Sequence, residues 1–137
     1  SIDYLLQQDK TLQKFSSKSI DIYVGDFFNL NPDQTSSFKA IYDRASIVAI
    51  DKPERREYVN HLISFLEQAG RILLITLEYN QSQMEGPPYS VPAKEIERLF
   101  APFGSLKLLE TCDILDDRFR NKGLTQLLEH VFLIVKD

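Results

Sequence analysis

The sequence is poor in the residues that mark several classes of protein. Its 137 residues include no tryptophan, one methionine, two histidines and a single cysteine, Cys112. One cysteine cannot form an internal disulfide, so we expect a reducing compartment. Neither His61 nor His130 has a cysteine or carboxylate at the spacing of metal ligands. The sequence therefore predicts neither a disulfide scaffold nor a metal site.

One-sided charge and long apolar runs are also missing. The formal net charge is −4, and the basic residues are scattered among acidic ones, whereas a nucleic-acid partner usually requires a basic face. No apolar run approaches the roughly 20 residues that span a bilayer, and no signal peptide is visible. We expect one domain over residues 1–137, located in the cytoplasm, with neither a nucleic-acid nor a membrane partner.

The apolar pattern that is present predicts strands alternating with helices. Residues 72–77 form a continuous apolar run, which is typical of a strand buried on both faces of a parallel sheet. Apolar residues at helical spacing predict a first helix over residues 2–15. Residues rich in β-branched and aromatic side chains predict four further strands, at 20–24, 38–42, 106–109 and 131–135. This alternation indicates an α/β fold.

Two more helices are expected between these strands. Asp51 begins a capping-box sequence, and Gly70 can end the helix that follows it. Ser90 can cap a second helix, which carries Ile96 and Leu99 on its apolar face. The chain thus reads as strand, helix, strand, helix, and then two closing strands.

The loop after the most apolar strand is the most specific motif. It lies at a strand's carboxyl end, where open α/β sheets hold their ligands. Four segments in order resemble the thiopurine S-methyltransferase family: Gly25-Asp26-Phe27-Phe28, Tyr42-Asp43-Arg44-Ala45, Gly86-Pro87-Pro88-Tyr89 and Arg118-Phe119-Arg120. The resemblance runs from about Ile20 to the end of the chain. One such segment would be a weak signal, whereas four in the family's order are a strong one.

The resemblance implies transfer of a methyl group from S-adenosylmethionine (SAM) to a small thiol or a related soft nucleophile. It places Asp26 near the adenine amino group of SAM and Phe27 against the adenine ring. Arg44 would lie near the SAM carboxylate and the acceptor, because a guanidinium suits bidentate carboxylate recognition. Arg118 would face the acceptor, and Pro88 would shape the rim of its pocket. No catalytic residue is assigned, since positioning can supply much of the acceleration of an in-line displacement.

Each of these residues also has a structural interpretation. Asp26 could be a turn residue followed by two core phenylalanines. Arg44 could form an ion pair with Asp43 or Asp51, and Arg118 could belong to a solvated charge cluster. The proline pair could simply be a rigid turn.

One departure from the family concerns the cofactor. The family binds the methionine and ribose of SAM with a glycine-rich turn, whereas the five glycines here, at 25, 70, 86, 104 and 123, are too far apart to form one. The sequence therefore looks like the carboxyl-terminal part of a Rossmann-like methyltransferase sheet with flanking helices, and we expect the chain alone to be inactive.

The strands would correspond to the third to seventh strands of the family's sheet. That arrangement leaves one edge of the strand at 38–42 open, and an open edge favours self-association. Two alternatives remain: methylation of inorganic selenium or tellurium species, and a noncatalytic chain that acts by association.

Overall fold

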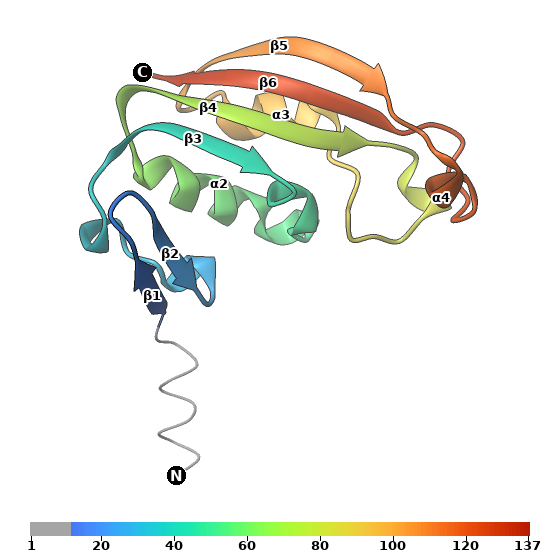
Figure 1. Ribbon diagram of the computed structural model, residues 1–137. Helices are drawn as coiled ribbons and strands as arrows, with labels where there is room; N and C mark the ends of the chain where they lie inside the picture. Colours follow the sequence, from blue (N-terminus) through green and yellow to red (C-terminus); the bar gives the residue numbers. More distant parts are fainter. Residues whose placement is uncertain (1–11) are drawn as a thin grey trace. The chain divides into compact units, whose positions relative to one another are not determined.

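The computed structural model describes residues 12–137, which belong to two compact units. The first unit ends at Ser36, and the second runs from Ser37 to Asp137. Figure 1 shows the helices and strands of each in chain order. No helix among the described residues is long and apolar enough to cross a membrane.

The described part of the first unit is a β-hairpin followed by two short turns. β1 (Gln13–Ser16) pairs with β2 (Asp21–Val24) in antiparallel fashion. Two 3-10 turns follow, at Phe27–Asn29 and Pro32–Gln34.

The hairpin confirms one expectation and corrects another. The strand expected at 20–24 is present as β2. The helix expected over residues 2–15 is wrong at its end, where Gln13, Lys14 and Phe15 lie in β1, and residues 2–11 fall outside the described residues. β1 is extended because it supplies the hydrogen-bonding partner of β2, with Phe15 opposite Ile22. Helical periodicity in a short segment cannot reveal such a partner.

The second unit is built on a mixed four-stranded sheet. Its strands are β3 (Phe38–Arg44), β4 (Leu66–Glu78), β5 (Gly104–Asp113) and β6 (Leu128–Lys136). They lie in the order β3-β4-β6-β5. β3 and β4 are parallel, and β6 runs antiparallel to β4 and β5. The four strands expected from the apolar runs are confirmed, and each extends beyond its predicted bounds.

Two helices cover one face of this sheet. α2 (Arg55–Ser64) and α3 (Ala93–Phe100) lie on the same side of β4 and β6 in Figure 1. Because side chains alternate along a strand, Ile72, Leu74 and Thr76 of β4 share the face towards these helices, and all three are fully buried. The core on this side includes Ile72, Leu74, Ile96, Phe100, Phe132 and Ile134. On the opposite face Leu73 remains 39% exposed, and β4 has an antiparallel neighbour in β6, so the expectation that residues 72–77 are buried on both faces of a parallel sheet is wrong.

The boundaries of both helices differ from the sequence-based expectation. α2 ends at Ser64, and Gly70 lies inside β4 instead of ending the helix. The chain changes from helix to strand before Gly70 because β3 begins to pair at Phe38, whose amide donates to the carbonyl of Phe65 at 2.8 Å. Asp51 makes no capping hydrogen bond through its side chain. α3 begins at Ala93 and is not capped by Ser90, whose hydroxyl accepts from the amide of Tyr79.

Candidate active site

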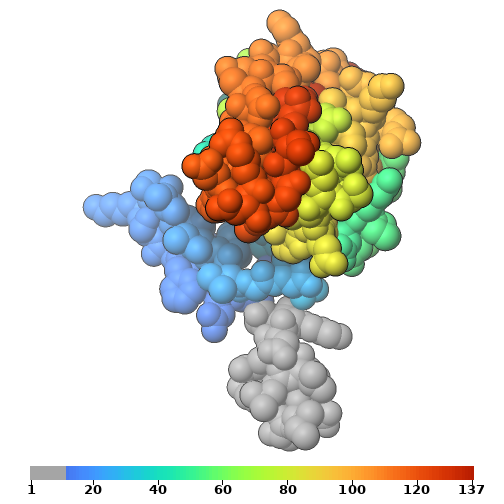
Figure 2. Space-filling view, turned by 90° about the vertical axis from the view of Figure 1, so that its right-hand side faces the viewer, coloured from blue at the N-terminus to red at the C-terminus, as the bar shows by residue number. Residues whose placement is uncertain are grey.

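A cavity of about 490 Å³ lies within the second unit, at the carboxyl ends of β3 and β4. The proline-containing loop after β4 borders it on one side, and the segment around α4 (Asp117–Arg120) on the other. Figure 2 shows this end of the sheet, with the yellow loop beside the orange-red α4 segment. The wall is formed by Arg44, Ala45, Val48, Ala49, Ile75, Leu77, Pro87, Pro88, Ile114, Arg118, Phe119, Leu127 and Glu129. It is therefore mostly apolar, with two cations and one carboxylate.

Strand register brings the first wall residues together. Arg44 at the end of β3 pairs with Ile75 of the parallel strand β4. Ala45 follows with a φ of 63°, a left-handed conformation that redirects the chain directly after the strand. The 3-10 turn Ile47–Ala49 then supplies further apolar wall. The cavity thus lies at the strand ends where the sequence predicted a ligand site.

Arg44 is exposed, and no ion pair to it occurs within residues 12–137. Asp43, the expected structural partner, is 2% exposed and accepts a 2.5 Å hydrogen bond from the Tyr58 hydroxyl. Burial raises the pKa of Asp43, and the Tyr58 hydrogen bond opposes that shift. Burial, and then the Asp43 charge, raise the pKa of Tyr58. The carboxylate beside Arg44 in sequence is therefore engaged elsewhere, and the guanidinium remains available to a ligand.

Arg118 lies in both environments that the sequence predicted, because it lines the cavity and also belongs to a charge cluster. Its guanidinium carbon lies 4.6 Å from the centre of the Phe119 ring, and both residues line the cavity. The same guanidinium lies 3.7 Å from the carboxylate of Asp116, whose side chain also caps α4. Since the ion pair is exposed, it contributes little to stability. Arg118 is thus part of a surface charge cluster at the mouth of the cavity.

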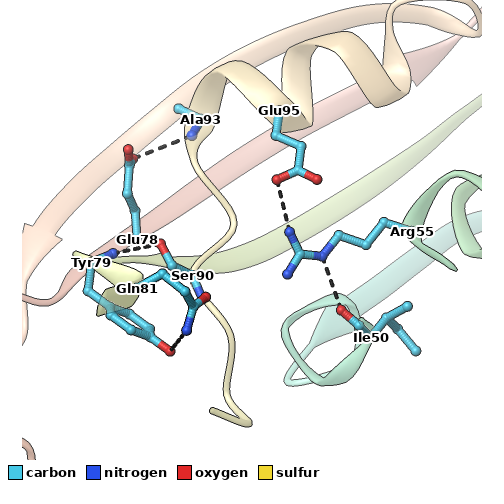
Figure 3. Close-up of polar contacts among 8 residues, drawn as sticks. All are labelled: Ile50, Arg55, Glu78, Tyr79, Gln81, Ser90, Ala93 and Glu95. Atoms are coloured by element: carbon cyan, nitrogen blue, oxygen red, sulfur yellow. Dashed lines mark hydrogen bonds and ion pairs between the residues drawn. The ribbon is translucent and has the colours of Figure 1, made fainter. Parts of the chain in front are cut away.

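The loop over residues 79–92 fixes Pro88 on the cavity wall. The Tyr79 hydroxyl donates to the Pro88 carbonyl at 2.6 Å, and the Gln81 amide donates to that hydroxyl at 3.1 Å. Gln81 also accepts from the amide of Ser90, whose hydroxyl accepts from the amide of Tyr79 (Figure 3). Burial raises the pKa of Tyr79, so its hydroxyl stays protonated as a donor. These bonds hold the rim in one conformation.

A buried ion pair lies beyond this loop. Nη1 of Arg55 is 2.9 Å from Oε2 of Glu95, and Nε donates to the carbonyl of Ile50 at 3.0 Å (Figure 3). The two charged side chains are only 4% and 10% exposed. The pair joins the start of α2 to α3, and sequence reasoning missed it because the partners are far apart in the chain.

His130 is also part of a polar network that sequence spacing did not reveal. Its Nε2 lies 2.6 Å from Oε2 of Glu78, and its Nδ1 lies 2.8 Å from the hydroxyl of Thr111. The same Glu78 oxygen accepts from the amide of Ala93 at the start of α3. The expectation of a structural histidine fits this buried position.

Asp26 and Phe27 belong to the first unit. Oδ1 of Asp26 accepts from the amide of Phe28 at 2.9 Å, which caps the turn that begins at Phe27. The Phe27 and Phe28 rings have their centres 6.3 Å apart. The cap matches the structural interpretation of Asp26 as a turn residue, whereas Phe27 and Phe28 are half-buried and are not core residues. The roles of Asp26 and Phe27 towards adenine stay predictions.

Glu129 is a wall residue that sequence reasoning missed. It lies in β6 opposite Leu77 of β4, so it shares the sheet face that lines the cavity. The alternation of side chains along the last strand carried a signal, because Glu129 and Val131 point to the same face. The sequence alone could not identify Glu129 as a wall residue, because only the strand register shows that this face lies beside Arg44.

Solved structures with a similar fold identify the architecture. One is an arsenic (III) S-adenosylmethionine methyltransferase from Chlamydomonas reinhardtii, with a TM-score of 0.60 and 16% identity, over 82% of this chain and 42% of that one. Another is the YcgJ protein of Bacillus subtilis, with a TM-score of 0.55 and 13% identity, over 73% and 64%. The fold is thus the carboxyl-terminal portion of a Rossmann-like SAM-methyltransferase sheet with flanking helices.

Sequence comparison narrows the class to a family. The family described as Thiopurine S-methyltransferase (TPMT) matches residues 4–137. Curated relatives named thiopurine S-methyltransferase include one from Nitrosospira multiformis, 39% identical over 89% of this chain and 56% of its own length, and one from Aliivibrio salmonicida, 42% identical over 90% and 57%. The chain belongs to the thiopurine S-methyltransferase family. It spans about half the length of the curated relatives it matches.

Proposed function

We propose that this chain provides the acceptor-binding part of a SAM-dependent methyltransferase whose acceptor is a small thiol or a related soft nucleophile. The observation that carries the proposal is the cavity at the ends of β3 and β4, whose apolar wall contains Arg44 and Arg118. Family membership supports the reaction class. Apolar surfaces such as Ile75 and Phe119 favour an organic acceptor over an inorganic selenium or tellurium species.

The geometry suits a reaction that depends on placement. SAM supplies an electrophilic methyl group on a sulfonium, and the acceptor must be held close to it and aligned. The apolar wall excludes water from the body of the acceptor, while the two guanidinium groups stabilise an anionic sulfur or carboxylate. A thiol that ionises near neutral pH needs no strong base, so positioning supplies much of the rate enhancement.

Taken separately, each unit contains side chains whose chemistry suits part of SAM. Arg44 is an exposed cation without an ion-pair partner in the described range, which suits the methionine carboxylate. The Asp26 carboxylate can accept from the adenine amine, and the half-buried Phe27 ring can stack on adenine. The sequence contains no glycine-rich turn for the rest of the cofactor. We therefore propose that the 137-residue chain binds SAM weakly and turns over little on its own.

Two titrations of the purified chain test these proposals. In the first, an aromatic thiol, 2-mercaptobenzoate, is followed by amide NMR. We expect the largest shifts near Ile75 and Leu127, and weaker binding by Arg44→Gln. Arg120→Gln is the matched control, because Arg120 pairs with Asp117 and does not line the cavity. Shifts confined to residues outside the cavity would contradict the acceptor site.

In the second titration, calorimetry measures SAM binding and a coupled assay measures methylation of the same thiol. Micromolar binding of SAM with turnover would overturn the proposal of weak activity. The single cysteine supports a cytoplasmic location, which we also propose.

A further inference from the structure

A second cavity, of about 660 Å³, lies between the start of α2, the loop over residues 79–92 and the start of α3. It shares no wall residue with the cavity at the ends of β3 and β4, which we call the acceptor cavity. The wall of the second cavity is polar, and its charged residues are four cations and three acids. The partners of these charged groups decide what the cavity can bind.

Arg55 is the buried cation of this wall, with a side chain only 4% exposed. Its Nη1 donates to Glu95, and its Nε donates to the carbonyl of Ile50. Its Nη2 donates no hydrogen bond within residues 12–137, and Figure 3 shows this nitrogen directed away from both partners. Among the described residues that are not exposed, only Oγ1 of Thr76 is fully buried without a hydrogen-bond partner. Nη2 is therefore open to the cavity, and its N–H groups are available to an acceptor atom of a ligand.

Three further cations line the same cavity. Lys52 lies in the 3-10 turn before α2, and Lys94 and Arg98 lie on α3. Because Lys94 and Arg98 are four residues apart on a helix, their side chains lie on the same side of it. All three cations are exposed, and none forms an ion pair within residues 12–137.

Most of the acids of this wall are already engaged. Glu95 is paired with Arg55. A hydrogen bond to Asp51 raises the pKa of Tyr89, so the tyrosine hydroxyl stays protonated and donates to that carboxylate. Among the acids of the described wall, only Glu85 has no such partner. The free cations therefore outnumber the free acids, and the cavity attracts an anion.

The arrangement of the donors suits a phosphate group better than a carboxylate. They come from the turn before α2, from α2 itself and from α3, and a tetrahedral phosphate can accept hydrogen bonds from several directions. A planar carboxylate, in contrast, is matched by a single guanidinium. Both helices begin at this cavity, and the positive ends of their dipoles add to the attraction. The cavity is larger than a phosphate group needs, and Tyr79 and Tyr89 supply aromatic surface for an organic group.

We propose that this second cavity binds the phosphate group of a small organic phosphate, through Arg55, Lys52, Lys94 and Arg98. The inference does not rest on the proposed function, because the two cavities have no wall residue in common. The loop over residues 79–92 contributes to both walls, with Pro88 in the acceptor cavity and Tyr89 in the second one. A ligand in the second cavity therefore contacts the loop that also shapes the acceptor cavity.

The test titrates the 137-residue chain with phenyl phosphate, inorganic phosphate and phenol, followed by amide NMR at constant ionic strength. Phenyl phosphate should shift the amides near Tyr89 and Lys94. It should bind about threefold or more tightly than inorganic phosphate, because its ring contacts the tyrosines. Phenol lacks the phosphate and should cause no shifts there over the same concentration range.

Two double variants with the same change in net charge show which cations are involved. Lys52→Gln combined with Lys94→Gln removes two exposed cations and leaves the buried Arg55 pair intact. The dissociation constant of phenyl phosphate should then rise about tenfold or more, as expected for lost charge-assisted hydrogen bonds. Lys39→Gln combined with Lys107→Gln, at exposed positions of β3 and β5 outside the cavity wall, should change it by less than about twofold, because distant exposed charges are screened.

Three results would overturn the proposal. An equal loss of affinity in both double variants would mean that phosphate is attracted only by the overall surface charge. Shifts centred on Ile75 and Leu127 would place the phosphate in the acceptor cavity. A folded wild-type chain whose amides near Lys94 do not respond to either phosphate would have no site there. None of these results changes the proposed function, which the titration with 2-mercaptobenzoate tests separately.

Discussion

Arg44 and Arg55 are used in different ways at two places in the second unit. Arg44 is exposed on the cavity wall, and the acid next to it in sequence is occupied by Tyr58. Arg55 is almost fully buried and holds Glu95 and a main-chain carbonyl. The difference shows that sequence neighbours do not reveal an arginine's role; the engagement of the nearby acids does. Among the described residues, the cation at a strand end without an ion pair is the one that we propose to bind a ligand, whereas the paired buried cation joins α2 to α3.

The largest effect should come from breaking the buried pair. Arg55→Met removes one partner and leaves the Glu95 carboxylate buried without its charge partner. Removal of one member of a buried ion pair typically costs about 3–5 kcal/mol. We expect a loss of that size in the free energy of unfolding, measured by urea denaturation at pH 7.

A second substitution sharpens this test. Arg55→Met combined with Glu95→Leu should recover part of the loss, because the double variant leaves no unpaired buried charge. Arg98→Met, an exposed position on α3, serves as the control and should change stability by less than about 0.5 kcal/mol. If Arg55→Met and Arg98→Met both changed the free energy of unfolding by similarly small amounts, the distinction between a buried, paired arginine and an exposed one would be wrong.

The reverse pattern is expected at Arg44. Arg44→Ala should weaken binding of the acceptor or of SAM by roughly 1.5–3 kcal/mol, the usual contribution of a charge-assisted hydrogen bond. Its free energy of unfolding should change by less than about 0.5 kcal/mol, because the side chain is exposed. Calorimetric or NMR titration alongside urea denaturation checks both values. A folded variant with unchanged affinity for both ligands would show that Arg44 is not a site residue.

The sequence predicted the strand ends but not the contacts that support them. The apolar run at 72–77 and the proline loop were sufficient to locate the cavity, because strand burial and turn chemistry are local signals. Arg44, Pro88 and Arg118 were placed in one site and do line one cavity. They share a position because of the order of the strands in the sheet, and the resemblance to the family provided that order.

The features that were missed depend on partners distant in the chain. Gly70 was expected to end a helix, but pairing with β3 draws the chain into β4 before that residue. Ser90 was expected to be a helix cap, yet it bonds Tyr79 across the loop. Glu129 reaches the cavity only through the register of β6 on β4. Tertiary pairing overrides local propensity in each case, and no periodicity reports it.

A smaller effect should distinguish Asp43 from the exposed acids. Burial raises its pKa above the ordinary value of 3.8. A carboxyl whose pKa is higher in the folded state stabilises the fold below its unfolded pKa, and this contribution is lost as pH rises through the raised pKa. Between pH 3.8 and that raised pKa, the unfolding free energy of the wild type should therefore fall with rising pH relative to Asp43→Asn.

Urea denaturation across this pH window checks the prediction, and Tyr58→Phe extends it. The Tyr58 hydrogen bond lowers the pKa of Asp43, so removal of the hydroxyl should shift the pH-dependent loss to higher pH. Parallel pH profiles for the wild type and Asp43→Asn would contradict a raised pKa at this residue.

The smallest expected effect concerns the two edges of the sheet. β3 and β5 are its outer strands. The outer edge of β3 has no strand partner within the second unit, and Tyr42 on this strand is 62% exposed. An open edge with exposed aromatic residues favours pairing with another chain. We therefore propose weak self-association through β3, detectable by sedimentation only at high protein concentration.

Tyr42→Lys should abolish this self-association, because a lysine on an edge strand opposes pairing. Leu108→Lys makes the matched change on β5, where Leu108 is 46% exposed, and should leave the association intact. Loss of association only in the Leu108 variant would assign the contact to β5, and a concentration-independent monomer would refute it at both edges.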